Sequence, residues 1–258
     1  EPDDRAQIMA RMPAADAAAI FERLEPDEQE ELVETMPPES VARIASEMEP
    51  DDRADLFSVL PPAVGEEIFE KLEKVDPEAA EDVREIEKWP DTSAGHLMTT
   101  RFVHARPDMT VADALAAVRA FAQESDASVY NVYAMSSDEK LLGIASLREL
   151  VISQPAQRVA DIMRTNFISV PPDLDQEEVA RRMAKYDLNA MPVVDANGVL
   201  LGLCTIDDIV DVLTEEQAED VQKLGAVEPL DMPYFQTGFF SFIRKRGLWL
   251  LALFIGEF

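Results

Sequence analysis

The sequence predicts a multidomain protein that consists of an all-α superhelical solenoid, a duplicated α/β region and a long connecting helix. Three patterns support this prediction. Apolar residues recur every twelve positions over the first ninety residues, a longer segment occurs twice with an offset of 65 residues, and acidic residues then recur every four positions. With 258 residues, of which 47% are hydrophobic, the chain is long enough for two or three domains with their own cores.

The twelve-residue repeat predicts that residues 1–90 form short helices stacked into a solenoid. Met36, Met48 and Leu60 are twelve residues apart, and prolines stand between the units. Proline is tolerated in the first turn of a helix and breaks its interior, so each unit is predicted to be a helix of about two turns that begins at proline. Such short helices are marginal alone and must bury an apolar stripe against their neighbours.

Negative charge is concentrated in this first region, which has 27 acidic and 9 basic residues and a net charge of −18, against −29 for the whole chain. This excess argues against nucleic acid as a partner, because phosphate binding needs clustered lysine and arginine. It favours divalent cations or simply a very soluble surface. Cys204 is the only cysteine, which excludes a disulfide framework and a cysteine-based zinc site, and His96 and His104 are expected to be ordinary polar residues.

A second, longer repeat begins at residue 94. The stretch "HLMTTRFVHARPDMTVADALAAVRAF" corresponds to "DIMRTNFISVPPDLDQEEVARRMAKY", and each ends in a predicted amphipathic helix. Two short strands and a closing helix follow in both copies, and the "ANG" of residues 196–198 is a hairpin turn signal. This β-α-β-β-α order resembles the CBS domain, which works as an intramolecular pair, over residues 94–153 and 156–214.

The resemblance implies a sensor module, and CBS pairs commonly bind adenine nucleotides, so ATP is a possible ligand. The ribose motif of the family is a glycine, two apolar residues, Thr or Ser, two further residues and Asp. The second copy matches it with Gly202, Thr205 and Asp208, whereas the first copy has Ser146 but Glu149 at the Asp position. The alternative is that Thr205 and Asp208 only cap the helix that follows.

The closing helix of the second copy is predicted to continue as an acidic connecting helix over residues 206–225. Its acidic stripe and flank include Asp207, Asp211, Glu215, Glu216 and Glu219. Like charges four residues apart destabilise a helix by a few tenths of a kcal/mol per pair. A divalent cation that prefers carboxylate oxygens, Mg²⁺ or Ca²⁺, would relieve this repulsion, and dispersed carboxylates suit Mg²⁺ bound weakly. The other interpretation is an exposed acidic linker helix.

Residues 239–258 contain a basic cluster followed by an apolar run from Gly247 to Gly256. The run is about half of the roughly 20 residues that span a membrane. Because basic residues collect on the cytoplasmic side of membrane segments, we expect the start of a transmembrane helix that continues beyond this sequence, in preference to a buried core helix or a terminal anchor. The chain would then be the cytoplasmic part of a multi-pass protein of the cell inner membrane.

The order of these parts resembles the MgtE family of magnesium transporters along the whole chain. The resemblance implies a homodimer in which solenoid and CBS pair sense Mg²⁺ and the connecting helix, called the plug helix, leads to a pore domain. Mg²⁺ ions between solenoid, CBS pair and plug helix would hold a closed state, and at low Mg²⁺ the solenoid would swing away. The positions that match family ligands are Asp91, Asp195, Asp207, Glu228 and Asp231, and Asn197 stands where relatives can carry a further acid.

The sequence is compatible with three functions. The first is the gating region of a magnesium transporter or channel. The second is a nucleotide-sensing CBS module of another membrane transport protein, which would bind ATP tightly and ignore Mg²⁺. The third is an interaction scaffold whose acids are only surface, and which would show no response to cations. An enzyme is not expected, because the sequence has no nucleophile–base set, Walker loop or metalloprotease motif.

Overall fold

The computed structural model of the chain describes residues 2–24, 26–124 and 127–214. The chain divides into two compact units, Glu1–Ile206 and Asp207–Phe258. The predicted transmembrane start at 239–258 and most of the predicted connecting helix at 206–225 lie outside the described residues. Within the described ranges, no helix combines the length and the apolar character that crossing a membrane requires.

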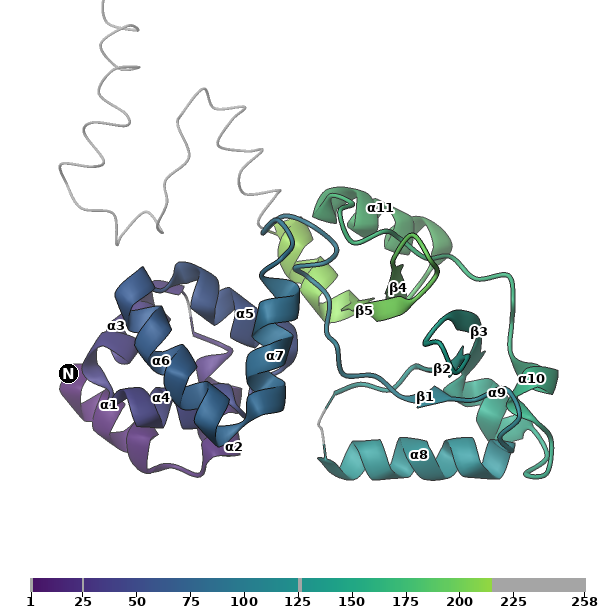
Figure 1. The fold of residues 1–258 in the computed structure, drawn as a ribbon, viewed down its shortest axis with the longest axis horizontal. Coiled ribbons are helices and arrows are strands. Elements are labelled where there is room, and N and C mark those ends of the chain that lie inside the picture. The colour runs from purple at the N-terminus through teal and green to yellow at the C-terminus, as the bar shows by residue number, and fades with distance from the viewer. Residues whose placement is uncertain (1, 25, 125–126, 215–258) are drawn as a thin grey trace, which may run out of the picture. The chain divides into compact units, whose positions relative to one another are not determined.

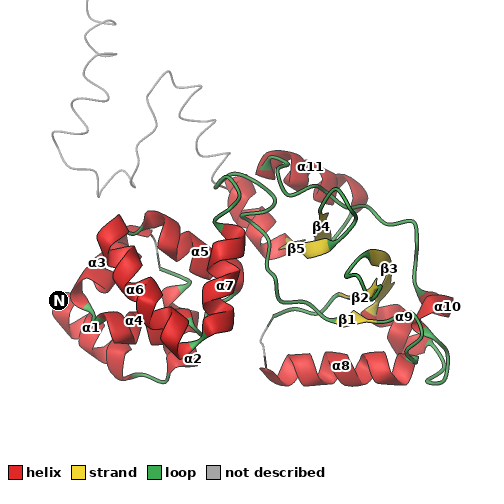
Figure 2. Cartoon of the chain, viewed as in Figure 1, coloured by secondary structure: helices red, strands yellow, loops and turns green. Residues whose placement is uncertain are grey.

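Seven helices occupy the described part of residues 2–86, called the helical region below (Figures 1 and 2). They are α1 (Pro2–Arg11), α2 (Ala14–Phe21), α3 (Pro26–Thr35), α4 (Pro38–Ala45), α5 (Pro50–Val59), α6 (Pro62–Val75) and α7 (Pro77–Ile86). Six of them begin at a proline and α2 follows Pro13, so the prediction of proline-initiated helices is confirmed.

Each helix of the helical region packs on the second helix along the chain: α1 on α3, α2 on α4, α3 on α5, α4 on α6 and α5 on α7. This is the packing of a solenoid. The apolar repeat fills its interior, since Ile44, Met48 and Leu56 are at most 1% exposed. Ile8 and Ile20 belong to the same repeat but are 61% and 41% exposed, because the first units of a stack have neighbours on one side only.

The duplicated region contains two sheets. One has β1 (His104–Ala105) parallel to β2 (Asn131–Met135), which is antiparallel to β3 (Leu141–Ser146); the other pairs β4 (Ala190–Val194) antiparallel with β5 (Leu200–Thr205). The accompanying helices are α8 (Val111–Glu124), α9 (Leu147–Ile152), α10 (Val159–Ile162), α11 (Gln176–Tyr186) and the helical residues 206–214. Gly198 has a φ of 82° in the predicted hairpin turn, a conformation that glycine adopts without strain.

The two copies exchange their leading segments. Hydrogen bonds of 2.9 Å join the backbones of Thr99 and Leu203 in both directions, and equivalent bonds join Arg164 to Ile144. Glycine is required where the first of these segments crosses β5, because a Cβ atom on Gly202 would lie 2.6 Å from the carbonyl oxygen of Thr99. Residues 94–206, called the CBS pair below, therefore fold as one body and not as two independent modules.

Candidate functional site

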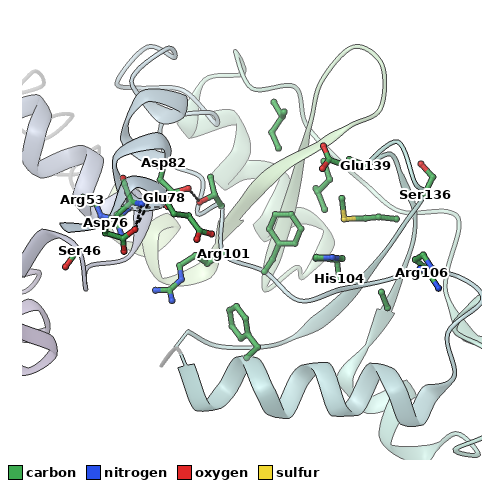
Figure 3. A pocket seen from close by; sticks show the side chains of 18 residues that line it. Ser46, Arg53, Asp76, Glu78, Asp82, Arg101, His104, Arg106, Ser136 and Glu139 are labelled. Carbon is green, nitrogen blue, oxygen red and sulfur yellow. Dashed lines mark hydrogen bonds and ion pairs between the residues drawn. The ribbon is translucent and has the colours of Figure 1, made fainter. Parts of the chain in front are cut away.

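The helical region and the CBS pair meet at a cavity of about 680 Å³, called the junction cavity below (Figure 3). The helical region lines it from α5, α7 and two residues next to helices, Ser46 and Asp76. The CBS pair lines it from residues between 100 and 106, from α8, from the end of β2 and the turn after it, and from the start of β5. The polar lining residues are Ser46, Arg53, Asp76, Glu78, Asp82, Thr100, Arg101, His104, Arg106, Ser136 and Glu139. Four of these are acidic and three are arginines, so the cavity presents charges of both signs.

The chain that connects the helical region to the CBS pair is anchored on the second CBS copy. The backbone N–H of Gln176 donates to the carbonyl of Thr92 at 2.9 Å, and the N–H of Ala94 donates to the carbonyl of Leu174 at 2.7 Å. Backbone bonds of this kind fix residues 92–95 in place. The side-chain contacts at the junction therefore start from an anchored segment.

Arg53 lies within the helical wall of the junction cavity and is only 2% exposed. Its guanidinium donates to the carbonyl oxygens of Ala45 (2.7 Å), Met48 (2.7 Å) and Ala79 (3.0 Å) and to Oδ2 of Asp82 (3.3 Å). Burial lowers the pKa of Arg53 from its ordinary value and Asp82 opposes that effect, but an arginine remains protonated at neutral pH. A permanent cation is therefore built into this wall.

Two carboxylates of the helical region contact the CBS pair close to Arg53. Oδ1 of Asp82 accepts a hydrogen bond of 2.7 Å from the Thr100 hydroxyl, while Oδ2 of the same carboxylate faces Arg53. An oxygen of Glu49 lies 3.7 Å from the guanidinium of Arg101. Asp82 thus links a buried cation of the helical region to a side chain of the CBS pair.

A third contact across the junction joins His96 to Asp55. His96 is 4% exposed, and its Nε2 lies 3.0 Å from Oδ1 of Asp55 on α5. The hydrogen bond with Asp55 raises the pKa of His96, desolvation opposes the rise, and the charges of Asp91 and Glu87 add to it. The sequence predicts that His96 is an ordinary polar residue; the structure adds a partner, Asp55, that lies 41 positions away and that no local pattern indicates.

Two of the predicted magnesium ligands, Asp91 and Asp195, lie in turns. Asp91 is exposed in the turn after α7. The Asp195 carboxylate accepts hydrogen bonds from the backbone of Val199 and Asn197, both at 2.8 Å, and from the Asn197 side-chain amide at 2.9 Å. These bonds, with that from Val199 foremost, lower the pKa of Asp195. The carboxylate is therefore ionised at neutral pH and also organises the β4–β5 turn.

The remaining predicted ligands belong to the connecting helix and the residues after it. Asp207 and Asp211 are exposed and four residues apart in the helical residues 206–214, so they share one face. The predicted ligands outside the described residues are Glu215, Glu216, Glu219, Glu228 and Asp231. Across 2–24, 26–124 and 127–214, no three His, Cys, Asp or Glu side chains form a group that could hold a metal ion.

The residues predicted to bind nucleotide lie near helix starts. Ser146 caps α9 and forms a capping box with Glu149, whose Oε2 accepts from the N–H (2.9 Å) and hydroxyl (2.8 Å) of Ser146. Arg164 donates to the other oxygen of Glu149 at 2.7 and 2.8 Å. In the first copy this motif therefore serves as a helix cap with an ion pair. Thr205 is the last residue of β5, and Asp208 lies in the helical residues after it.

Solenoid, exchanged copies and junction together define a CBS-pair protein with an acidic helical domain. Family models agree: the MgtE intracellular N domain matches residues 1–92, and the CBS domain matches residues 94–154 and 159–215. The crystal structure of the soluble part of a magnesium transporter is 31% identical, with a TM-score of 0.79, and the match covers 84% of each chain. The cytosolic domain of the Mg²⁺ channel MgtE in complex with ATP is 36% identical, with a TM-score of 0.76, over 82% of this chain and 85% of that one.

The chain belongs to the MgtE family of magnesium transporters. MgtE of Thermus thermophilus is 39% identical over 186 residues, and MgtE of Bacillus subtilis is 35% identical over 185. Each match covers 72% of this chain and 41% of the relative, so the chain spans about two fifths of the length of these curated proteins. Because these relatives are transporters, the prediction that the chain is not an enzyme is confirmed.

Proposed function

We propose that this chain is the Mg²⁺-sensing gating region of a homodimeric magnesium transporter or channel. It lies on the cytoplasmic side of the cell inner membrane and leads into a transmembrane pore domain. Mg²⁺ ions bridge carboxylates of the helical region, the CBS pair and the connecting helix, and in this way hold the closed state. Similarity to the cytosolic domain of the Mg²⁺ channel MgtE and to MgtE transporters supports the proposal.

The observation that carries the proposal is the junction between the helical region and the CBS pair. Residues 1–90, with a net charge of −18, meet the CBS pair at a cavity lined by four carboxylates, and side-chain contacts of Asp82, Glu49 and Asp55 span this boundary. Among the residues that the structure describes, the hydrophobic cluster from Ala6 to Val83 contains members of the helical region alone. Because so large a negative charge repels itself, we expect added cations to favour closure of this junction.

A cation that bridges two domains can shift the equilibrium between the open and the closed junction. A ligand shifts an equilibrium between two states only if it binds one of them more tightly. An ion held by carboxylates of two domains meets this condition, because opening the junction separates its ligands. Dissolved monovalent salt only screens the same carboxylates, over a distance of about 8 Å at physiological ionic strength. Divalent cations are therefore expected to close the junction where K⁺ at equal ionic strength does not.

The donor chemistry of the predicted ligands fits Mg²⁺. Asp91, Asp195, Asp207 and Asp211 offer carboxylate oxygens, the ligands that Mg²⁺ and Ca²⁺ prefer. Mg²⁺ usually keeps several waters and takes only one or two carboxylates directly, so it does not need a group of three side chains. Dispersed carboxylates contributed by different parts of the chain are sufficient for a hydrated ion that binds weakly.

The test is limited proteolysis of the chain during a Mg²⁺ titration, with K⁺ adjusted to constant ionic strength and Ca²⁺ as the comparison ion. Cleavage near residues 88–94, between the helical region and the CBS pair, should fade as Mg²⁺ rises through the millimolar range. Cleavage that stays constant at every Mg²⁺ concentration would overturn the sensor function. Equal protection by K⁺ alone would reduce the effect to screening.

Nucleotide binding in the second CBS copy is the second candidate function. It is favoured by the sequence motif that ends in Thr205 and Asp208 and by the relative whose structure is a complex with ATP. An Asp carboxylate that accepts two ribose hydroxyls forms charge-assisted hydrogen bonds, so Asp208→Asn should weaken ATP binding about tenfold or more. Calorimetry with ATP measures this effect. Glu149→Gln in the first copy is the matched control and should leave the affinity unchanged.

A further inference from the structure

We propose that Arg53 is a positioning residue for the junction: it holds Asp82 as the acceptor for Thr100, so that one contact between the helical region and the CBS pair closes without a divalent cation. This Arg53–Asp82–Thr100 latch rests on the proposed function, because it concerns the regulation of the same junction. Figure 3 shows Arg53 and Asp82 together on the helical wall of the junction cavity.

The position of Arg53 is fixed entirely within the helical region. Its guanidinium donates to the carbonyls of Ala45, the last residue of α4, and of Met48 in the turn that follows, and to the carbonyl of Ala79 on α7. Carbonyl groups at the end of a helix carry partial negative charge, so a cation is favoured there. Since none of these acceptors belongs to the CBS pair, the guanidinium stays in place whether the junction is open or closed.

Asp82 uses its two oxygens in different directions. Oδ2 faces Arg53 at 3.3 Å, and Oδ1 accepts from the Thr100 hydroxyl at 2.7 Å, with the Asp82 side chain 21% exposed. Thr100 follows Thr99, whose backbone is paired with Leu203 of β5. The latch therefore runs from the inside of the helical region to the sheet of the second CBS copy.

The latch differs from a magnesium bridge in one physical respect. Mg²⁺ leaves when its concentration falls, whereas a buried guanidinium cannot leave. The contribution of a contact that depends on Arg53 is therefore the same at low and at high Mg²⁺, and it favours the closed junction by a constant amount. It follows that the latch sets how much Mg²⁺ is required to complete closure, and that breaking it raises this requirement.

The cleanest test changes Thr100, which is outside the helical region. Thr100→Val removes the hydroxyl at nearly constant volume, and Thr100→Ser keeps it. We expect Thr100→Val to raise the Mg²⁺ midpoint for protection of Lys88 from trypsin about five- to tenfold, as for loss of a hydrogen bond to a charged group. Thr100→Ser should restore the wild-type midpoint. Thr35→Val is the matched control, because the Thr35 hydroxyl donates to the carbonyl of Glu31 within α3.

Arg53→Met tests the positioning role. If Arg53 acts through Asp82, the double variant of Arg53→Met with Thr100→Val should shift the midpoint no further than Thr100→Val alone, whereas independent effects would add. Circular dichroism of each variant confirms that the helical region is folded. Should Arg53→Met unfold it, the Thr100 variants still decide the proposal.

The results separate the latch from the sensor function. An unchanged midpoint in Thr100→Val, or an equal shift in Thr100→Ser, would overturn the latch while the wild type still responds to Mg²⁺. If the wild type itself shows no Mg²⁺ response, the proposed function fails. In that case faster cleavage of Thr100→Val than of wild type without Mg²⁺ still supports the latch, and equal cleavage rates contradict it.

Discussion

The interior of the helical region and its junction with the CBS pair depend on different forces. Inside the helical region, apolar side chains such as Ile44 and Met48 are fully buried. At the junction, the buried side chains include the charged or ionisable Arg53 and His96, and carboxylates face them. Apolar burial responds little to ions, whereas contacts between charges respond to salt, divalent cations and pH. The helical region is thus expected to keep its shape while its attachment to the CBS pair adjusts.

The largest expected effect is on the stability of the helical region. It compares a buried and an exposed residue at equivalent positions of the twelve-residue repeat. Ile44→Ala removes a side chain that is 1% exposed and should lower the free energy of unfolding of the helical region by about 3 kcal/mol. Ile8→Ala, at the 61% exposed position of the same repeat, should change it by less than about 0.5 kcal/mol. Urea denaturation followed by circular dichroism measures both. Equal losses would mean that the apolar repeat does not form one buried stripe.

A smaller effect tests whether the CBS pair depends on close backbone contact. Gly202→Ala would place a Cβ atom 2.6 Å from the carbonyl oxygen of Thr99, so we expect a loss of about 1–3 kcal/mol in thermal unfolding. The control is Gly65→Ala in α6, where the nearest atom lies 3.9 Å away and alanine is the better helix former. That variant should be neutral or more stable by up to about 1 kcal/mol. A stable Gly202→Ala protein would contradict the exchange of segments between the copies.

The part of the fold that the sequence predicts well is governed by local rules. Prolines place the starts of the helices because a missing N–H is tolerated only in the first turn, and the structure begins six helices at proline. The hairpin at Gly198 follows from its turn residues, and its strands follow from the short apolar runs on either side of that turn. What the repeat does not predict is where the stack ends, which is why the exposure of Ile8 and Ile20 departs from the pattern.

The junction could not be predicted because its partners are distant in sequence. Arg53 and Asp82 are 29 positions apart, Asp82 and Thr100 are 18 apart, and Asp55 and His96 are 41 apart. In the sequence Arg53 stands in the acidic stretch "DDRAD", which reads as solvated surface. The predicted magnesium ligands came from resemblance and from a charge stripe. Of these, the structure describes Asp91, Asp195, Asp207 and Asp211, and their role in binding remains a prediction.

The smallest expected effect concerns pH at the junction. The hydrogen bond with Asp55 raises the pKa of His96 above its ordinary value near 6.5. The contribution of this contact to closure is therefore fully present below about pH 6.5 and is lost as pH rises through the raised pKa. Protonation of His96 and binding of Mg²⁺ then both favour the closed junction. The Mg²⁺ midpoint for protection of residues 88–94 should be about threefold lower at pH 6 than at pH 8.5, since Asp55 is exposed and such a pair contributes at most about 1 kcal/mol.

The groups that face His96 decide how this result is interpreted. Besides Asp55 of α5, they are Asp91 and Glu87 of the segment after α7, and burial raises the pKa of Glu87, so that carboxyl also takes up protons as pH falls. His96→Gln keeps every carboxylate and removes only the imidazole, so its Mg²⁺ midpoint should lose the threefold pH dependence. His104→Gln, at an exposed histidine, should retain it. If His96→Gln keeps the full pH dependence of the Mg²⁺ midpoint, the group that takes up the proton is Glu87 or another acid. The junction would then still respond to pH, but not through His96.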